Sequence, residues 1–431
     1  MSGAGSLRTF ALQLLCGLAL GLPAAAAWSD SESAQQPLAA PDVARTSWFD
    51  PSTLPVIPVP LIGVDPNSGT TLGVIPTWVH TDDAGHISRI IAPDVTHNPY
   101  FGWGGNFRIY AYPSDDQQYS VIANFNERIQ RGIDFEYQGG RLRTGRWSIN
   151  ASLVDDRDGT PRFYGIGNES PEFDATDYTN QQERVQVQVG LNLNHFWQVQ
   201  YTGREQAVDV LPGQLSDVVS LQTRFSHVLG IGTNDLQLNR LALIFDSRND
   251  VTIPTEGMKW VAYGGLASRH GLINDSMYSE AGVDGRAFWP VLTDTILTTH
   301  MALRYLPSAY RVPFWALSSI GGGESEIGGE QPLRGFGAGR FYDRDSFSTS
   351  IEIRRRVASF DAMATRVEVE VTPFVDLGRV FSRTGTFPLD QLHQVYGMGF
   401  RGIARPSVVG YVDIGYGSSG VAAFTGINYP F

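Results

Sequence analysis

The sequence predicts an all-β fold, a transmembrane antiparallel β-barrel, from three features. Runs of about ten residues alternate between apolar and polar side chains, which is long enough for a tilted strand to cross a bilayer. Such runs fill residues 69–431, with aromatic residues near many of their ends. The chain ends with Ile427, Tyr429 and Phe431 at alternate positions, a pattern typical of the assembly signal of outer-membrane barrels. These features together predict an integral protein of a bacterial-type outer membrane.

Composition excludes several other classes of protein. The chain has 431 residues and a formal net charge of −12, and 18% of its residues are charged, against about 25% in an average soluble domain. The chain is too apolar and too aromatic for a disordered protein. Its acidic balance gives no basic surface for nucleic acid, so none is expected as a partner. After residue 27 no apolar run of about 18 residues occurs, which excludes a helical membrane bundle.

Residues 1–27 are predicted to be a secretory signal peptide. Arg8 precedes an apolar run over residues 10–27, which ends in four alanines typical of a cleavage site. An uncleaved N-terminal anchor is the alternative. The only cysteine of the chain, Cys16, lies in this segment. A mature chain would therefore contain no disulfide and no thiolate metal site.

Residues 28–58 are predicted to form a periplasmic spacer, and residues 59–431 the barrel. The spacer contains five prolines with little hydrophobic periodicity, which favours extended, unpaired chain. The segment is also too short to bury a core of its own.

The strands are predicted from their two-residue period. In residues 185–193 every odd position is Val or Leu and every even position is Gln, Gly or Asn. Counted back from the end of the chain, nine runs are expected, at 421–431, 408–417, 394–404, 365–377, 345–357, 294–306, 277–290, 256–270 and 236–247. Seven to nine more are expected between residues 69 and 228. An even total follows if both termini face the periplasm, so the count allows 16 or 18 strands.

Short motifs add a resemblance to a known family. The first is Leu333-Arg334-Gly335-Phe336 after a Gly-rich approach, and the second contains Phe374, Asp376 and Gly378. The third combines Asp246 and Arg248 with Pro254 and Gly257, and the fourth is the stretch 163–168. Together they resemble the bacterial surface antigen superfamily of BamA/TamA-like outer-membrane assembly factors. The resemblance implies 16 strands, which we adopt, and a long extracellular loop that folds into the lumen. Only the spacer precedes the barrel, which resembles a branch of the family without periplasmic POTRA modules.

The loop of residues 320–345 is expected to plug the lumen through a bond between Arg334 and Asp376. Alternation places Asp376 on the polar face of its strand, and a guanidinium binds a carboxylate through two parallel hydrogen bonds. A fixed staple and a movable gate remain alternatives for this loop. The seam between the strands near 69–80 and 421–431 is expected to be the weakest part of the wall, because the last strand is rich in small residues.

Three classes of function follow from these features. Insertion or transport of protein or lipid at the outer membrane is the preferred one, and a passive channel for small solutes is the alternative. An enzyme is not expected, because no catalytic constellation appears among the scattered histidines and serines, and neither a metal site nor a cofactor is predicted. Outer-membrane lipid, and the barrel assembly machinery during biogenesis, are the expected partners. The transported substrate and the oligomeric state stay open.

Overall fold

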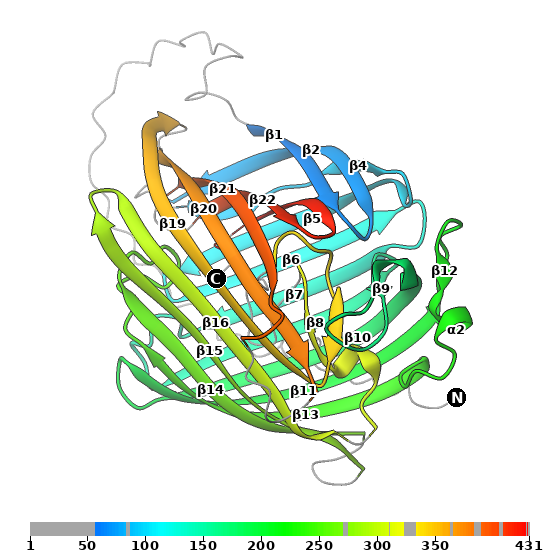
Figure 1. The fold of residues 1–431 in the computed structure, drawn as a ribbon. Coiled ribbons are helices and arrows are strands. Elements are labelled where there is room, and N and C mark those ends of the chain that lie inside the picture. Colours follow the sequence, from blue (N-terminus) through cyan, green and yellow to red (C-terminus); the bar gives the residue numbers. More distant parts are fainter. Residues whose placement is uncertain are drawn as a thin grey trace, which may run out of the picture.

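The computed structural model describes residues 57–82, 87–269, 275–309, 311–322, 333–362, 365–382, 389–404, 408–427 and 429. The long strands among these residues form one antiparallel sheet whose first and last strands pair with each other, so the wall closes into a barrel (Figure 1). The predicted signal peptide and nearly all of the predicted spacer lie outside the described residues. The first strand begins at Ile57, two residues before the predicted start of the barrel.

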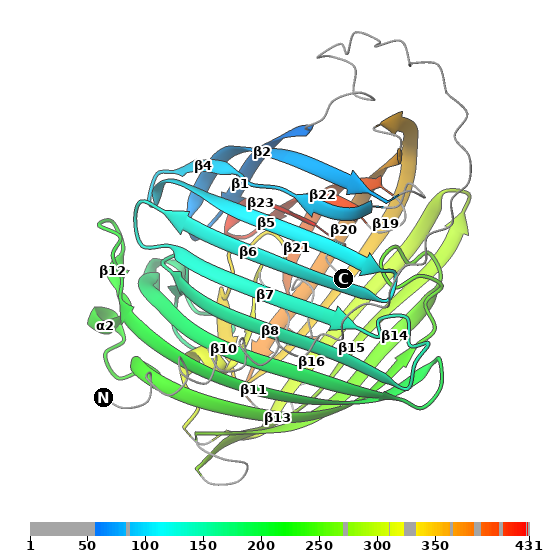
Figure 2. The ribbon, with the colours of Figure 1, turned by 180° about the vertical axis from the view of Figure 1, so that it is seen from behind.

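The wall strands follow one another around the barrel in chain order (Figure 2). They are β1 (Ile57–Asp65), β2 (Gly69–Thr81), β3 (Ile87–Ile91), β4 (Val95–Asn98), β5 (Gly102–Ser114), β6 (Gln117–Asn126), β7 (Arg131–Gly139), β8 (Trp147–Asp158), β10 (Thr176–Asn192), β11 (Trp197–Pro212), β13 (Gly232–Asp246), β14 (Gly257–Ser268), β15 (Ser276–Leu292), β16 (Thr295–Ala309), β19 (Asp345–Ala362), β20 (Thr365–Phe381), β21 (His393–Ala404), β22 (Val408–Gly417) and β23 (Gly420–Ile427).

The described part of the chain forms 18 wall strands. β3 and β4 share one position, because both pair with β2 on one side and with β5 on the other. The adopted prediction of 16 strands is therefore wrong. The alternative of 18 strands, which the count from the sequence also allowed, is correct. The strand that counting missed is β1, whose run over residues 57–65 begins in the proline-rich stretch assigned to the spacer.

Two kinds of connection join the wall strands. At one end, called the turn end here, they are short, such as residues 193–196 between β10 and β11. At the other end, called the loop end, they carry the small elements β9 (Arg162–Phe163), η1 (Glu172–Asp174), β12 (Val219–Ser220), α2 (Leu221–Arg224), η2 (Phe314–Ala316), β17 (Ser318–Ile320) and β18 (Phe341–Asp343). No helix in the described ranges is long and apolar enough to cross a membrane.

The barrel closes through very little backbone pairing. Nine residue pairs join β1 to β2, from Ile57↔Thr77 to Asp65↔Gly69, whereas the single pair Val64↔Ala423 joins β1 to β23. The seam was predicted between residues 69–80 and 421–431. It lies one strand earlier on its N-terminal side, because β1 and not β2 is the first strand.

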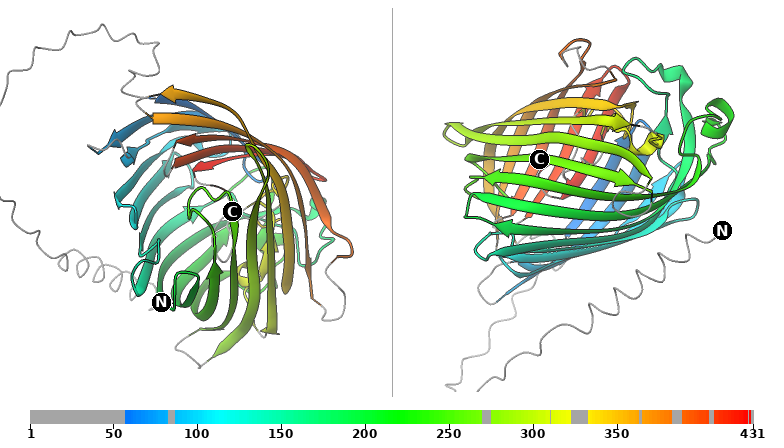
Figure 3. Two further views of the ribbon diagram at one scale, coloured as in Figure 1. Left: turned by 90° about the vertical axis from the view of Figure 1, so that its left-hand side faces the viewer. Right: turned by 90° about the horizontal axis from the view of Figure 1, so that it is seen from below.

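Side chains alternate across the wall as the sequence predicts. Val187, Val199 and Leu243 are exposed on the outward face, while Gln198 and Arg240 are buried on the inward face. A lipid-facing outer surface and a polar interior explain this arrangement. Figure 3 shows from two further directions how the strands of the wall curve around the interior of the barrel.

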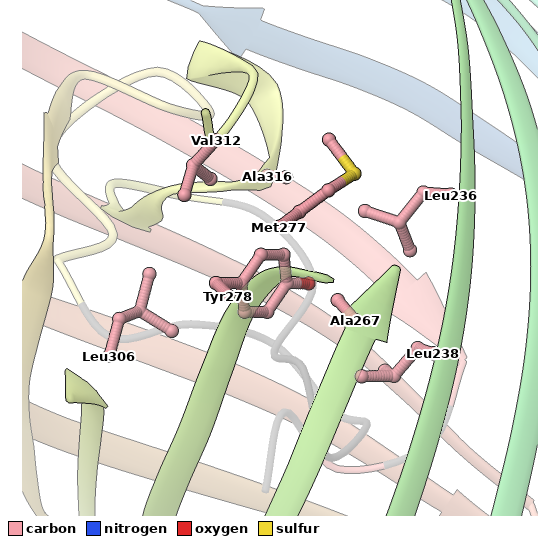
Figure 4. Packing of buried hydrophobic residues seen from close by; sticks show 8 residues of the cluster. All are labelled: Leu236, Leu238, Ala267, Met277, Tyr278, Leu306, Val312 and Ala316. Carbon is pink, nitrogen blue, oxygen red and sulfur yellow. The ribbon is translucent and has the colours of Figure 1, made fainter. Parts of the chain in front are cut away.

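An apolar core lies inside the loop end. Residues of the connection after β16, Val312 and Ala316, pack against Leu236, Leu238 and Tyr278 on the inward faces of β13 and β15 (Figure 4). A second cluster joins Phe314 and Tyr342 to Phe163 and Tyr178. This packing holds the described parts of the connection between β16 and β19 against the inside of the wall, because apolar side chains leave water when they meet.

Candidate functional site

Arg334 lies in a cluster of buried charges on the inward face of the wall. The Arg334 cluster consists of three bases and three acids, all at most 1% exposed: Arg334, Arg354, Arg401, Glu352, Asp376 and Asp413. Five members stand on β19, β20, β21 and β22, and only Arg334 comes from the connection between β16 and β19. The cluster therefore fastens this connection to four consecutive strands.

Asp376 captures both the side chain and the backbone of the connection. Its Oδ2 accepts hydrogen bonds from the backbone N–H groups of Leu333 and Arg334 and from Arg334 Nε, each at 3.0 Å. Its Oδ1 accepts one from Arg334 Nη2 at 2.8 Å. Ser350 Oγ also donates to Oδ1, at 2.6 Å, and accepts from Arg334 Nη2 at 3.0 Å. The predicted two-point pairing of Arg334 with Asp376 is thus present in the structure.

Two further carboxylates bind Arg334, and neither of them belongs to the sequence motifs that predicted the site. Arg334 Nη1 donates to Glu352 Oε1 and to Asp413 Oδ2, at 2.6 Å each. Arg354 Nε binds Glu352 at 2.8 Å, and Arg401 binds Asp413. The two-residue period over residues 345–357 puts Glu352 on the polar face of its strand. The same period over residues 408–417 puts Asp413 there, but only the fold shows that both strands face one loop residue.

The cluster is neutral when it is complete. Burial alone would lower the pKa of Arg334, but the carboxylates, Asp376 and Glu352 first, hold that pKa well above its usual range. In a watery lumen, losing one partner of such a pair would cost about 1 kcal/mol or less. The observed burial instead places the pairs in the range where such a loss costs about 3–5 kcal/mol.

The other residues of the motif shape the backbone around Arg334. Leu333 has a φ of 74°, a strained conformation for a branched side chain, and is fully buried. A Cβ at Gly335 would stand 2.7 Å from the backbone N of Gly417, so only glycine fits there. Phe336 is fully buried beside Phe341. The motif therefore combines one polar anchor with close backbone packing.

The docking strand contributes packing as well as charge. The ring of Phe374 lies under the guanidinium of Arg334, 3.6 Å from ring centre to Cζ. Such stacking stabilises a cation over an aromatic face. A Cβ at Gly378 would stand 3.2 Å from Leu333 Cδ1, so glycine leaves room for Leu333. The structure brings all predicted residues of these two motifs together.

The connection also reaches the far side of the seam. Asn67, in the turn between β1 and β2, donates from Nδ2 to the carbonyl of Ala338 at 2.9 Å. On the β23 side of the seam, the carbonyl oxygen of Arg334 packs closely against Gly415 in β22. A Cβ added at Gly415 would stand 2.2 Å from that oxygen. Residues 333–338, called the clasp here, therefore touch the first hairpin and the second-last strand. They span the seam from inside the barrel.

The strand-turn motif forms a separate structure at the turn end. Arg248 binds Asp246 through Nε at 2.9 Å and Nη2 at 2.8 Å, and its Nη1 donates to the carbonyl of Val251. Pro254 is buried and Gly257 begins β14. Ile253, directly before Pro254, packs against Ile403 and Val409 of β21 and β22. The turn thus reaches across the barrel to the opposite wall, a contact that its sequence does not reveal.

Gly257 gives a prediction about stability. Its φ is 96°, and a Cβ would stand 2.2 Å from the Ser247 carbonyl oxygen, so Gly257→Ala introduces strain of about 1–3 kcal/mol. The temperature at which the folded band disappears on a heat-modifiability gel should fall by several degrees. Gly402→Ala is the matched control, because a Cβ there meets nothing within 4 Å. Equal melting of both variants would contradict the strain.

The C-terminal signal is described only in part. Ile427 ends β23, opposite Gly410 of β22, and Phe431 lies outside the described residues. Tyr429 follows the strand and turns inward, donating from its hydroxyl to Glu370 at 3.3 Å and lying 4.0 Å from Arg354 Cζ. The alternation predicted for Ile427, Tyr429 and Phe431 stays a prediction, since the segment is described only in part.

No group of three or more potential metal ligands is found in the part of the chain that the structure describes. With the fold and the Arg334 cluster in view, comparisons with known proteins become informative. A family model, the Omp85 superfamily domain, matches residues 100–403. This match confirms the resemblance predicted from the motifs. No curated protein matches the sequence.

Two solved structures are similar to this chain at low identity. One is BamA from Haemophilus ducreyi lacking POTRA domains 1–3, with 12% identity, a TM-score of 0.48, and coverage of 82% of this chain and 75% of that one. The other is CdiB from Acinetobacter baumannii, with 15% identity, a TM-score of 0.47, and coverage of 83% of this chain and 65% of that one.

Proposed function

Because this chain belongs to the Omp85 superfamily of bacterial outer-membrane barrels, we propose that it takes part in inserting or transporting protein or lipid at that membrane. In this proposal the loop of residues 320–345 fills the lumen, and the bond between Arg334 and Asp376 holds it there. Outer-membrane lipid surrounds the barrel, and the barrel assembly machinery inserts it. No catalytic step is assigned to the chain.

The observation that carries the proposal is the clasp across a weak seam. One register pair joins β1 to β23, so separating these strands breaks little backbone pairing. The clasp touches Asn67 beside β1 and Gly415 in β22, so its position depends on the distance between the two sides. Release of the clasp would therefore favour opening of the wall toward the lipid, where a hydrophobic or strand-forming substrate can leave.

Photo-crosslinking tests this route. A benzoylphenylalanine placed at Ala423, on the outward side of the seam, should capture newly made, pulse-labelled protein or lipid, and the adduct should form less after a chase. The same probe at Leu243, which is exposed on β13 away from the seam, is the matched control. Equal capture at both positions, or capture that does not change during the chase, would rule out transit through the seam.

A passive channel is the alternative, and two contacts argue against it. The clasp lies against the wall inside the loop end, and the turn with Ile253 crosses the turn end to reach Ile403 and Val409. Both narrow the path through the barrel. Purified protein in planar bilayers should therefore give small, flickering conductance events. A large and steady conductance would instead favour the channel.

A further inference from the structure

A second site lies inside the loop end, away from the Arg334 cluster. It is a cavity of about 330 Å³ between the inward faces of β1, β2, β4, β5, β6 and β8. This volume is at the lower end of the range of about 300–1,000 Å³ for small-molecule sites. No member of the Arg334 cluster lines it. The cavity therefore needs an explanation of its own.

Side-chain amides dominate the lining of this cavity. Five come from β4, β5, β6 and the turn after β6: Asn98, Asn106, Asn124, Asn126 and Gln130. The side-chain nitrogens of Asn98, Asn106 and Gln130 already donate to Thr71, Asp94 and Asp158, so a ligand hydroxyl would mainly meet acceptor oxygens such as Asn124 Oδ1. The ring of Phe101 also lines the cavity, but it is only 2% exposed, so it closes the cavity and offers no face to a ligand. This lining suits a ligand with many hydroxyls.

Hydrogen bonds within the lining hold several of these groups in place. Gln130 accepts from Asn126 Nδ2 at 2.5 Å and donates to Asp158 Oδ1 at 2.9 Å, and Thr160 Oγ1 donates to Asp158 Oδ2 at 2.7 Å. Asn124 Oδ1 is different, because it is buried and has no hydrogen-bond partner among the described residues. A buried acceptor without a donor is unfavourable, and a ligand hydroxyl would supply the missing hydrogen bond.

The charge of the lining selects among polar ligands. Asp156 and Asp158 contribute two carboxylates, and none of the described lining residues is Lys or Arg. Carboxylates accept hydrogen bonds from hydroxyls but repel anions. The cavity therefore disfavours phosphates and acidic sugars and favours a neutral polyol.

The wall below the cavity continues the same chemistry. Inward-facing amides pair across neighbouring strands: Gln118 with Gln138 at 3.0 Å, Asn150 with Gln188 at 3.1 Å, and Gln206 with Gln182 at 3.1 Å. Charged groups stand among these amides: Arg204 Nε donates to Gln186, and Glu136 accepts from Gln138. Side-chain amides thus recur along this side of the interior, from the cavity toward the turn end.

We propose that this cavity binds one unit of a neutral saccharide. Its hydroxyls bind the amides and the two carboxylates. This inference does not depend on the clasp or on the opening of the seam. The two proposals can therefore fail separately.

Calorimetric titration of the purified protein with N,N′-diacetylchitobiose and with maltose tests the site. The detergent should be a zwitterionic amine oxide, because alkyl maltosides would themselves compete. We expect saturable binding of at least one disaccharide in the millimolar range and none of glucuronate. Arg334→Ala should bind the disaccharide as the wild type does.

Variants locate the binding. Asn124→Leu should weaken it at least about tenfold, because it removes a hydrogen-bonding group and fills part of the cavity. Asn150→Leu is the matched control, an inward amide of β8 outside the lining, and should bind normally. Gln130→Leu serves as a second test if Asn124→Leu lacks the folded band on a heat-modifiability gel.

Three outcomes would overturn the proposal. The first is the absence of saturable binding for both neutral disaccharides. The second is equal binding by the wild type and by folded Asn124→Leu and Gln130→Leu. The third is binding of glucuronate as tight as that of the neutral disaccharides, which would contradict the selection by charge.

Discussion

Arg334→Ala should release the clasp while the barrel stays folded. The substitution leaves three buried carboxylates with two arginines, and such an imbalance costs about 3–5 kcal/mol. The penalty falls on docking of the clasp, because the wall strands keep their own backbone ladders. A loss of about 3 kcal/mol corresponds to an opening about 100-fold more frequent. Hydrogen exchange at the amides of Leu333 and residue 334, which bind Asp376, should accelerate by that factor.

Three further variants make this test specific. Arg354→Ala is the matched control, because it removes the same charge from the Arg334 cluster and its ion pair joins two positions of one wall strand. It should leave exchange at Leu333 almost unchanged. Asp376→Asn should release the clasp as Arg334→Ala does, and the double variant should be no worse than either single one. Additive effects of the two substitutions would show that the residues do not act as a pair.

A disulfide between Val64→Cys and Ala423→Cys should lock the barrel and stop its transport. These residues form the one register pair of the seam, so their Cα atoms lie opposite each other. The only native cysteine, Cys16, lies in the predicted signal peptide and should not interfere. The link closes a ring of most of the chain, for which a stabilisation of about 5 kcal/mol is expected. The melting temperature should rise, and transient adducts at the seam should disappear until a reductant is added.

The pair Val64→Cys and Thr70→Cys is the matched control for this lock. It uses the same residue of β1 but links it to β2, within the first hairpin. It should leave transit unchanged, since it does not cross the seam. If the oxidised seam variant still forms and releases adducts at the wild-type rate, lateral opening is not part of the mechanism.

The sequence by itself determined the class of fold and most of the strands. The alternation over residues 185–193 depends only on the chemistry of the two faces of a wall, with lipid on one side and polar groups on the other. The structure places Val187 outward and buries Gln198 of the neighbouring strand inward, as that pattern requires. The motif around Arg334 also identified its partner Asp376, because a polar-face carboxylate and a loop arginine have complementary charges.

The count of strands and the site of the seam were decided by tertiary structure. Residues 57–65 contain prolines and alternate weakly, so local propensity argues against a strand. The segment becomes β1 because β2 offers it a complete ladder of nine pairs. This ladder belongs to the hairpin that the segment forms with β2, and the prolines of the segment hide it from local propensity.

Which residues come together at each site depends on tertiary structure even more strongly. Asp413 and Glu352 are 61 positions apart in the sequence (413 − 352), yet both bind Arg334 Nη1 at 2.6 Å. Ile253 meets Ile403 across the barrel, and Asn67 meets the carbonyl of Ala338. Alternation fixes the face on which a side chain stands, since it follows from the local geometry of a strand. Which inward-facing groups share one space depends on strand order, curvature and closure, and these arise only when the whole wall assembles.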